Sequence, residues 1–291
     1  MRKPPRLMPA MITPFTEHGV IDADAHGSNV AILSSSRIEG FLIAGSTGEG
    51  QYLEPGERRL LVETARASVP DAYLMCGIAA ESLRGAMSQT SEAVDGGADS
   101  VLVITPTSLV RGRDDLVTDF YRDVADRSPV PIFLYSVPKV TGYELPTSVA
   151  ASLSGHKRVA GMKDSGGQPL RVPALLEGSP SGFDVYSGST PALSLSIMAG
   201  ARGGITASSN YAGGLALAVI EAAKASAATS MGPQAKLTRV ASAVEQHGIA
   251  GVKAAAAMIG LVPGWVRRPL APPSPAAVET IRAALEAAAI I

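Results

Sequence analysis

The chain has 291 residues, of which 46% are hydrophobic and only 4% are aromatic. This length and apolar content suit one large domain with a sizeable core and a short extension. The net charge is −1, from 25 basic and 26 acidic side chains, so we expect no nucleic-acid partner. Cys76 is the sole cysteine of the sequence, which excludes an internal disulfide and a multi-cysteine metal site.

Two features argue against export and against a membrane span. Prolines interrupt the first 14 residues, where a signal peptide needs an apolar run. The most apolar helical stretch, Ala212–Ala228, contains Glu221 and Lys224, which a membrane span disfavours. We therefore expect a cytoplasmic protein with no membrane partner.

Short apolar runs alternate with longer helical patterns along most of the chain. The predicted strands are Leu7–Thr13, Gly40–Ala44, Tyr73–Ile78, Ser100–Thr105, Pro131–Val137, Val159–Lys163, Asp184–Ser187 and Gly204–Ala207. The predicted helices between them are Asp24–Ser36, Pro55–Ser68, Ser82–Asp95, Asp114–Arg127, Pro146–Leu153 and Pro191–Ala199.

These strands are apolar throughout rather than alternating, which indicates a parallel sheet covered on both faces. Eight strand–helix units favour a closed (β/α)8 TIM barrel over an open doubly wound sheet. No strand pattern follows Ala207, and the Ala-rich tail predicts helices over residues 213–228, 232–247, 249–259 and 275–290. We expect residues 1–210 to form the barrel and residues 211–291 a C-terminal helical extension packed on it.

In a parallel barrel the active site forms at the carboxyl ends of the strands. Lys163 lies at such an end, directly after the apolar residues 159–162. Burial disfavours an ammonium group, and the neutral amine is a nucleophile toward carbonyl groups. The alternative is a lysine whose stem packs on apolar surface while its head reaches water.

Tyr135 ends the neighbouring predicted strand, so its phenol could reach the same mouth as Lys163. A phenol beside an amine or imine can relay the protons that carbinolamine formation and collapse require. The alternative is a tyrosine that fills the barrel end with its hydroxyl in water.

The segment Gly45–Gly50 follows the second predicted strand and allows two interpretations. It is a weak phosphate-binding motif, because no Lys-Ser/Thr pair follows as in a P-loop. Its exposed amides and the hydroxyls of Ser46 and Thr47 could hold a carboxylate without a metal. The alternative is an ordinary turn with no binding role, in which the glycines adopt backbone angles that other residues disfavour.

Other chemistries have little support in the sequence. The four histidines are scattered, none pairs with a carboxylate at a strand end, and we expect no metal and no cofactor. Ser187 and Ser189 have no nearby histidine base for a serine hydrolase. No G-x-G-x-x-G motif follows the first strand, which excludes a dinucleotide site of that type.

Four blocks, in their order and spacing, resemble the signature of the dihydrodipicolinate synthase/N-acetylneuraminate lyase family. They are Gly45–Glu49, Tyr135–Pro138 with Thr141-Gly142, Gly161–Asp164 and Ser187-Gly188. The resemblance spans nearly the whole chain, including the tail segment Val266–Leu270. Within the family, Leu134–Pro138 and Gly161–Gly167 look most like 4-hydroxy-2-oxoglutarate aldolases.

The resemblance implies a class I aldolase or lyase that acts on pyruvate or a related small 2-oxo acid. It implies that Lys163 forms the imine, that Tyr135 is the general acid and base, and that Ser46 and Thr47 hold the carboxylate. The backbone of Ile205 would line the same pocket. The family is usually a homotetramer, built as a dimer of dimers.

Two departures from the family pattern bear on the substrate. Synthases of the family carry an arginine shortly after the tyrosine block to bind the second substrate's carboxylate, and here that position is Val140. The family usually has a relay tyrosine after the Thr-Pro of the fourth strand, where this chain has Thr107 and Ser108. Val140 predicts that aspartate semialdehyde is a poor co-substrate.

The main expectation is therefore cleavage of a 4-hydroxy-2-oxo acid. The alternatives are a dihydrodipicolinate synthase (4-hydroxy-tetrahydrodipicolinate synthase), a sugar-acid dehydratase, and a non-catalytic barrel that binds a 2-oxo acid.

Overall fold

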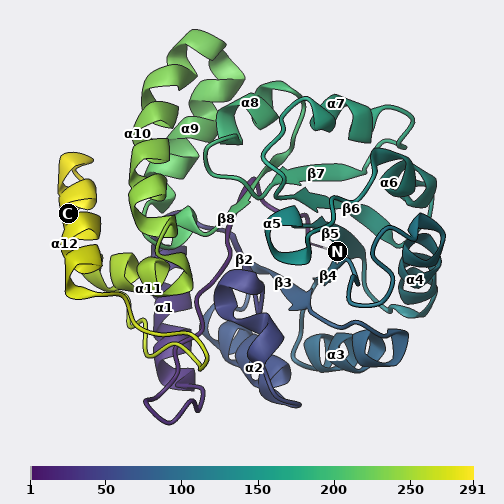
Figure 1. Cartoon of the computed structure of the whole chain (residues 1–291), viewed down its shortest axis with the longest axis horizontal. Helices are drawn as coiled ribbons and strands as arrows, with labels where there is room; N and C mark the ends of the chain where they lie inside the picture. The colour runs from purple at the N-terminus through teal and green to yellow at the C-terminus, as the bar shows by residue number, and fades with distance from the viewer. Residues whose placement is uncertain (1) are drawn as a thin grey trace.

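Eight parallel strands lie around a common axis in the order β1-β8-β7-β6-β5-β4-β3-β2 (Figure 1). The computed structural model describes residues 2–291. A bridge between Ala10 and Leu42 joins the two edge strands and nearly closes the barrel. The strands are β1 Leu7–Pro9, β2 Gly40–Ile43, β3 Tyr73–Ile78, β4 Ser100–Ile104, β5 Ile132–Ser136, β6 Val159–Asp164, β7 Asp184–Ser187 and β8 Gly203–Thr206.

The predicted TIM barrel is thus confirmed, and β3 and β7 have the predicted bounds. Strand β1 is the main difference, since it ends at Pro9 rather than Thr13. The reason is that the residues after Ala10 support a loop instead of a strand: the Thr13 hydroxyl donates a hydrogen bond to the backbone oxygen of Gly48.

Helices cover the outside of the barrel (Figure 1). They are α1 Ala23–Ser35, α2 Glu57–Ser68, α3 Leu83–Asp95, α4 Asp114–Arg127, α5 Pro138–Thr141, α6 Thr147–Ser154, α7 Arg171–Leu176, α8 Leu193–Met198, α9 Gly213–Ala225, α10 Ala227–Glu245, α11 Gly248–Met258 and α12 Pro275–Ala287. Three short 3-10 turns add to them: η1 Ser46–Gly48, η2 Gly50–Tyr52 and η3 Ser208–Asn210.

Two short helices, α5 and α7, were not predicted, because each is too short to show a helical period. Helix α10 begins at Ala227, five residues before the predicted start at Gly232. The side chain of Ser226 caps it by accepting a hydrogen bond from the amide of Thr229. Pro233 therefore lies inside the helix, at its seventh residue, where it cannot donate the backbone hydrogen bond to the carbonyl four residues earlier.

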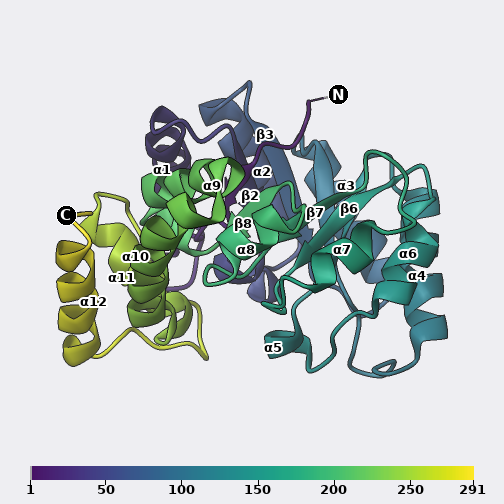
Figure 2. The same ribbon diagram turned by 90° about the horizontal axis from the view of Figure 1, so that it is seen from above.

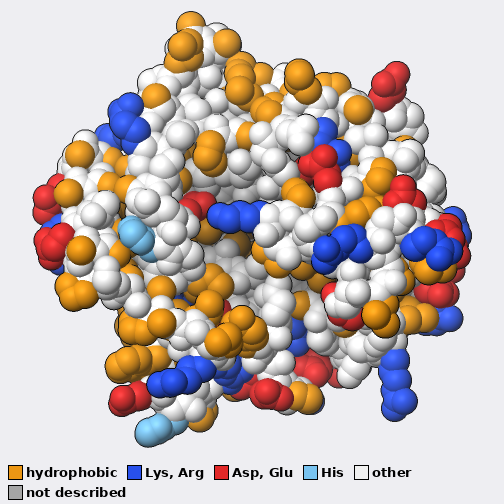
Figure 3. Space-filling model, in the orientation of Figure 1, with side chains coloured by type: hydrophobic (Ala, Val, Ile, Leu, Met, Phe, Trp, Pro, Cys, Tyr) orange, Lys and Arg blue, Asp and Glu red, His pale blue; other side chains and the backbone are white. Residues whose placement is uncertain are grey.

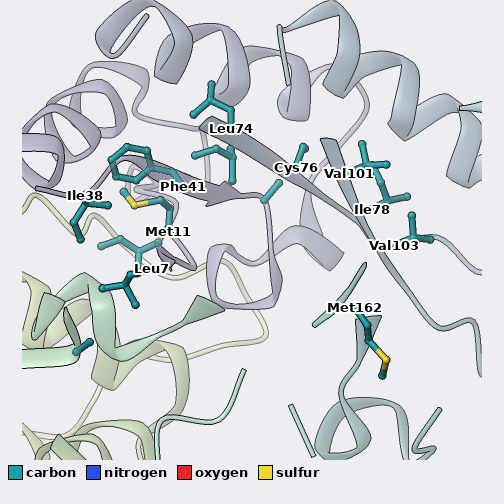
Figure 4. Close-up of a cluster of buried hydrophobic side chains, with 14 of the residues drawn as sticks. Leu7, Met11, Ile38, Phe41, Leu74, Cys76, Ile78, Val101, Val103 and Met162 are labelled. Carbon is teal, nitrogen blue, oxygen red and sulfur yellow. The ribbon is translucent and has the colours of Figure 1, made fainter. Parts of the chain in front are cut away.

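Strand side chains alternate between the barrel interior and the surrounding helices. The interior is a cluster that includes Met8, Leu42, Met75, Leu102, Phe133, Tyr135, Tyr186 and Ile205. The outward side chains pack under the helices, and Figure 4 shows part of that layer, with Leu7, Phe41, Leu74, Cys76, Val101 and Met162. Because side chains alternate, Met162 points outward and its neighbour Lys163 inward.

The amino-terminal end of the barrel is sealed by two tyrosines. The hydroxyl of Tyr73 donates to Ser100 Oγ at 2.6 Å, and that of Tyr186 donates to the backbone oxygen of Pro5 at 2.9 Å. Burial raises the pKa of Tyr73 to about 12, so this phenol stays protonated near neutral pH. The open end of the barrel is therefore the other one, where α5 lies (Figure 2).

The last helices form a layer on one side of the barrel (Figure 2). Helix α9 contacts α8 and β1, whereas α10 packs on α9, and α12 packs on α10 and α11. We propose that α9 completes the helical ring, so that the extension proper begins with α10, later than the expected boundary at residue 211. Within residues 2–291, no helix combines the length and apolarity needed to cross a membrane.

Candidate active site

Lys163 and Tyr135 meet at the open end of the barrel. They are register partners on β6 and β5, so both side chains point into the interior. Lys163 is 4% exposed and Tyr135 is 5% exposed. Lys163 Nζ lies 3.4 Å from the Tyr135 hydroxyl and 4.5 Å from the centre of its ring. A buried amine therefore has a phenol within reach for proton transfer.

Gly188 makes room for the Lys163 side chain. A Cβ atom at Gly188 would lie 2.8 Å from Lys163 Cε and 1.9 Å from Ser165 Oγ. The carboxylate of Asp164 fixes the strand end from the outside, because Arg171 Nε donates to it at 2.9 Å and the amide of Gly166 at 2.8 Å. The direction of Lys163 is thus set by glycine on one side and an ion pair on the other.

Ser46 and Thr47 lie in the turn that follows β2, and both are half-buried. The Ser46 hydroxyl accepts a hydrogen bond from Gln51 Nε2 at 3.2 Å, which leaves its own proton free for another acceptor. Ser46 and Tyr135 line one cleft, which also includes Ala44 and Ile104. Thr47 does not line that cleft.

Buried charges hold this turn in place. Glu49 has a positive φ of 58°, and its side chain is fully buried. Glu49 Oε1 lies 2.7 Å from Lys253 Nζ on α11, an ion pair without the alignment of a hydrogen bond. Glu49 Oε2 accepts from the amide of Arg267 at 2.7 Å. Arg58, also buried, donates to the backbone oxygens of Gly50 and Gly77.

This arrangement ties the predicted carboxylate-binding turn to the C-terminal extension. Burial lowers the pKa of Lys253, and the facing Glu49 carboxylate opposes that effect. Lys253 also donates to the backbone oxygen of Trp265. The sequence alone does not reveal these contacts, because about 200 residues separate the partners.

Ile205 is fully buried on β8, where it pairs with Met8. Its backbone belongs to the wall of the barrel interior, in the same cluster as Tyr135. The structure thus brings Lys163 and Tyr135 into direct contact and sets Ser46 beside Tyr135. Thr47 and Ile205 lie around the same mouth without a direct contact to Lys163 among the described residues.

The loop after β4 and the helix α5 form the other part of the mouth. Val140 is 58% exposed and Leu109 is 96% exposed. The amides of Thr107 and Ser108 donate to Glu81 Oε2 at 2.8 and 2.9 Å, and the exposed Ser108 does not line the cleft that Tyr135 lines. No residue in this loop occupies the place of a relay phenol.

Glu245, the last residue of α10, is a half-buried carboxylate at this end of the barrel that sequence reasoning missed. Its Oε1 accepts hydrogen bonds from Thr190 Oγ1 and from the Tyr211 hydroxyl, each at 3.2 Å. Burial raises the pKa of Glu245, and the two hydrogen bonds and the nearby charges of Lys139 and Lys163 oppose the increase. Nothing in the sequence around Glu245 indicates a site, because it ends an ordinary surface-type helix.

The mouth is visible as a hollow in the centre of the face shown in Figure 3, with basic and acidic side chains at its rim. Across residues 2–291, no group of three His, Cys, Asp or Glu side chains is placed to hold a metal ion. The groups at hand are an amine, a phenol, hydroxyls and a carboxylate. These are the groups required for imine formation and proton transfer.

The model of the Dihydrodipicolinate synthetase family matches residues 3–288. The chain belongs to this family. It is thus an enzyme, a carbon–carbon or carbon–oxygen lyase that uses a lysine Schiff base. The family expected from the four sequence blocks is confirmed.

Relatives with assigned activities cover almost the entire chain. The 4-hydroxy-tetrahydrodipicolinate synthase of Methanothrix thermoacetophila is 34% identical over 274 residues, which cover 92% of this chain and 91% of that protein. The enzyme of the same name from Methanosarcina mazei is 30% identical over 273 residues, covering 92% and 93%.

Solved structures give the same fold. A chloride-inhibited dihydrodipicolinate synthase from Acinetobacter baumannii, complexed with pyruvate, superposes with a TM-score of 0.92 at 26% identity, covering 99% of both chains. A dihydrodipicolinate synthase from Thermotoga maritima gives a TM-score of 0.91 at 25% identity, again covering 99% of both.

Proposed function

We propose that this enzyme binds pyruvate as an imine on Lys163 and joins it to an aldehyde, in a synthase-type condensation. The observation that carries the proposal is the pairing of the buried Lys163 amine with the Tyr135 hydroxyl at 3.4 Å. In this proposal Ser46 and Thr47 hold the carboxylate of the 2-oxo acid, and the backbone of Ile205 lines the pocket.

The first half of the reaction needs only these groups. The Lys163 amine adds to the oxo carbon, and Tyr135 protonates the oxygen so that it leaves as one water molecule. Loss of a proton from the adjacent methyl carbon gives the nucleophilic enamine. Ser46, with its own proton free and Tyr135 in the same cleft, is suited to pass protons to the tyrosine.

The second half joins the enamine carbon to the aldehyde carbon, whose oxygen takes a proton and becomes the 4-hydroxyl group. If the aldehyde carries an amine, as aspartate semialdehyde does, that amine displaces Lys163 from the imine and closes a ring. No further water is released in that exchange. The free lysine then starts the next cycle.

The synthase reaction is preferred to the cleavage that the sequence blocks favoured, because the relatives that cover the chain are named 4-hydroxy-tetrahydrodipicolinate synthase. Cleavage of a 4-hydroxy-2-oxo acid is the second candidate. It runs through the same imine, and two observations favour it: the exposed Val140 offers no charge for a second carboxylate, and Ser108 does not line the cleft with Tyr135.

Borohydride trapping tests the imine directly. We expect pyruvate and borohydride to add one reduced adduct to the intact protein, and we expect the Lys163→Ala variant to give none. Lys157→Ala, which removes an exposed lysine outside the barrel, is the matched control and should be trapped as the wild type is. An adduct that persists in Lys163→Ala, or that maps to Lys157, would refute the proposal.

A rate comparison then separates the two candidates. Pyruvate consumption with aspartate semialdehyde is measured beside pyruvate release from 4-hydroxy-2-oxoglutarate. A higher kcat/KM for the condensation supports the synthase. The reverse order establishes the cleavage and confirms what Val140 predicts.

We also propose that the enzyme is a homotetramer, a dimer of dimers. Among the exposed apolar side chains are Leu109 after β4, and Leu170, Leu195 and Met198 at α7 and α8, with exposures of 96%, 89%, 55% and 38%. Exposed apolar side chains on different segments of this kind suit contacts with other subunits. One similar structure, at 25% identity, is a monomeric dihydrodipicolinate synthase variant. Light scattering therefore tests the proposal by measuring the mass of the wild type, expected to be that of a tetramer, and of Leu170→Glu, expected to be smaller.

A further inference from the structure

The mouth of the barrel contains one acidic and one basic side chain that the chemistry at Lys163 does not use. Glu245 reaches the mouth from the end of α10, and Lys139 lies on α5, directly after Pro138. The sequence analysis gave neither residue a role. They come from elements more than 100 residues apart, and both lie at the carboxyl-terminal end of the barrel: Lys139 follows β5, and Glu245 is hydrogen-bonded to Thr190 after β7.

Glu245 is held firmly by one of its two oxygens. Thr190 and Tyr211, which are 2% and 1% exposed, both donate to Oε1. Thr190 is itself fixed by Ser208, whose Oγ lies 2.9 Å from Thr190 Oγ1. Oε2 accepts no hydrogen bond from residues 2–291. It is not fully buried, so a ligand can reach it.

Lys139 is exposed and forms no ion pair within 4.0 Å with a carboxylate of residues 2–291. It is nevertheless close enough to Glu245 for its charge to oppose the rise in that carboxyl's pKa. Glu245 accepts a hydrogen bond from Thr190 just beyond the end of β7, and Lys139 lies on α5 just beyond the end of β5, so the two opposite charges lie at the same end of the barrel without an ion pair between them. A ligand with a negative and a positive group side by side would satisfy both.

We propose that Glu245 and Lys139 together bind the zwitterionic end of the aldehyde substrate. Glu245 Oε2 accepts hydrogen bonds from the α-ammonium group, and Lys139 Nζ donates to the α-carboxylate. Lys139 thereby supplies the positive charge that Val140 lacks for binding the carboxylate. This inference rests on the proposed condensation with pyruvate, and it makes both residues determinants of specificity rather than of imine formation.

Two aldehydes of equal chain length test the assignment. Aspartate semialdehyde and succinic semialdehyde both carry the carboxylate, and only the first carries the ammonium group. The wild type should prefer aspartate semialdehyde in kcat/KM. A charge-assisted hydrogen bond contributes enough for roughly ten- to a hundred-fold discrimination, so Glu245→Gln should lose about that factor on aspartate semialdehyde alone.

Lys139→Met should lower kcat/KM for both aldehydes by a similar factor, because both carry the carboxylate. Glu279→Gln, which removes an exposed carboxylate from α12, is the control and should match the wild type. All variants should trap pyruvate with borohydride as the wild type does, which shows that the imine site is intact.

Several results would overturn the inference. Equal losses on both aldehydes in Glu245→Gln, or no loss at all, would show that Glu245 does not contact the ammonium group. A loss in Arg111→Met instead of Lys139→Met would move the carboxylate site to Arg111, whose guanidinium lies beside Gly142. Pyruvate trapping without consumption of either aldehyde would refute the clamp and leave the imine standing. Absence of trapping would refute the proposed function itself.

Discussion

The turn after β2 and the loop after β4 lie at the same mouth but are held in different ways. In the first, Glu49 and Arg58 are buried charged residues that bind backbone and side-chain groups from distant segments. In the second, Thr107 and Ser108 are tied only through their amides to Glu81, and Leu109 is almost fully exposed. We call the first the anchored half of the mouth, together with Lys163, and the second the open half, together with α5.

The difference suggests a division of labour. Imine chemistry depends on the distance between an amine and a phenol, so it benefits from a rigid surrounding. Selection of an aldehyde depends on groups at the rim, which can change without disturbing the core. Variants in the anchored half should therefore affect catalysis and stability, and variants in the open half should affect substrate choice.

The largest effect is expected at Tyr135. Tyr135→Phe removes the phenol that contacts Lys163 and should lower turnover by roughly 100- to 10,000-fold, the usual contribution of general acid–base catalysis. Steady-state kinetics on a variant that retains its circular dichroism spectrum provide the measurement. Turnover within a few fold of the wild type would show that another group carries the protons.

The Glu49–Lys253 pair tests the anchoring. Lys253→Met leaves Glu49 buried without its cation, and we expect a loss of about 3–5 kcal/mol in the free energy of unfolding. Urea denaturation is the measurement. The double variant Glu49→Gln/Lys253→Met should recover much of the loss, because neither charge is then buried alone. A single variant as stable as the wild type would contradict the anchored character of this half.

Substitution of Val140 examines the open half. Val140 is 58% exposed, so Val140→Arg should fold normally and add a cation at the rim. We expect kcat/KM for aspartate semialdehyde to rise by up to roughly tenfold, the equivalent of about 1.4 kcal/mol, with pyruvate trapping unchanged. An unchanged or lower kcat/KM would show that a cation at this position does not reach the substrate carboxylate.

His26 makes the anchored half sensitive to acid. It lies on α1, which packs on the helix α2 that carries Arg58, and burial lowers the pKa of His26 to about 4 from 6.5. Between these values the unfolded chain binds one more proton, so stability falls as the pH falls, by about 1.4 kcal/mol per pH unit. The loss begins near pH 6.5 and is about 2 kcal/mol at pH 5.

The variant His26→Leu should remove this slope. Urea denaturation at pH 7 and pH 5 measures it in both proteins, and the comparison cancels the pH dependence that arises elsewhere. An equal slope in the two proteins would show that His26 is protonated in the folded state as readily as in the unfolded one.

The smallest effect is expected at Ser108. Its side chain is exposed and does not line the cleft with Tyr135, so Ser108→Ala should lower kcat/KM by less than about tenfold, or roughly 1.4 kcal/mol. The same steady-state assay serves. A loss as large as that of Tyr135→Phe would place the serine in the proton relay.

The sequence by itself determined the barrel and the pair at its centre. Eight uniformly apolar runs can be buried on both faces only in a parallel sheet, and the alternation of side chains then directs Lys163 and Tyr135 inward together. The short helices α5 and α7 and the early start of α10 escaped prediction, because local periodicity needs several turns to be visible.

Only the tertiary structure decided how the mouth is held and what it selects. Glu49 forms an ion pair with Lys253, and Glu245 accepts a hydrogen bond from Thr190. In each case the two residues are far apart in the sequence, so no local sequence pattern predicts the contact. A lone glutamate at a helix end is ordinarily a solvated residue, and its position at the mouth depends on which helices α10 packs against. Contacts of this kind depend on packing between distant elements, which the chain establishes only when it folds.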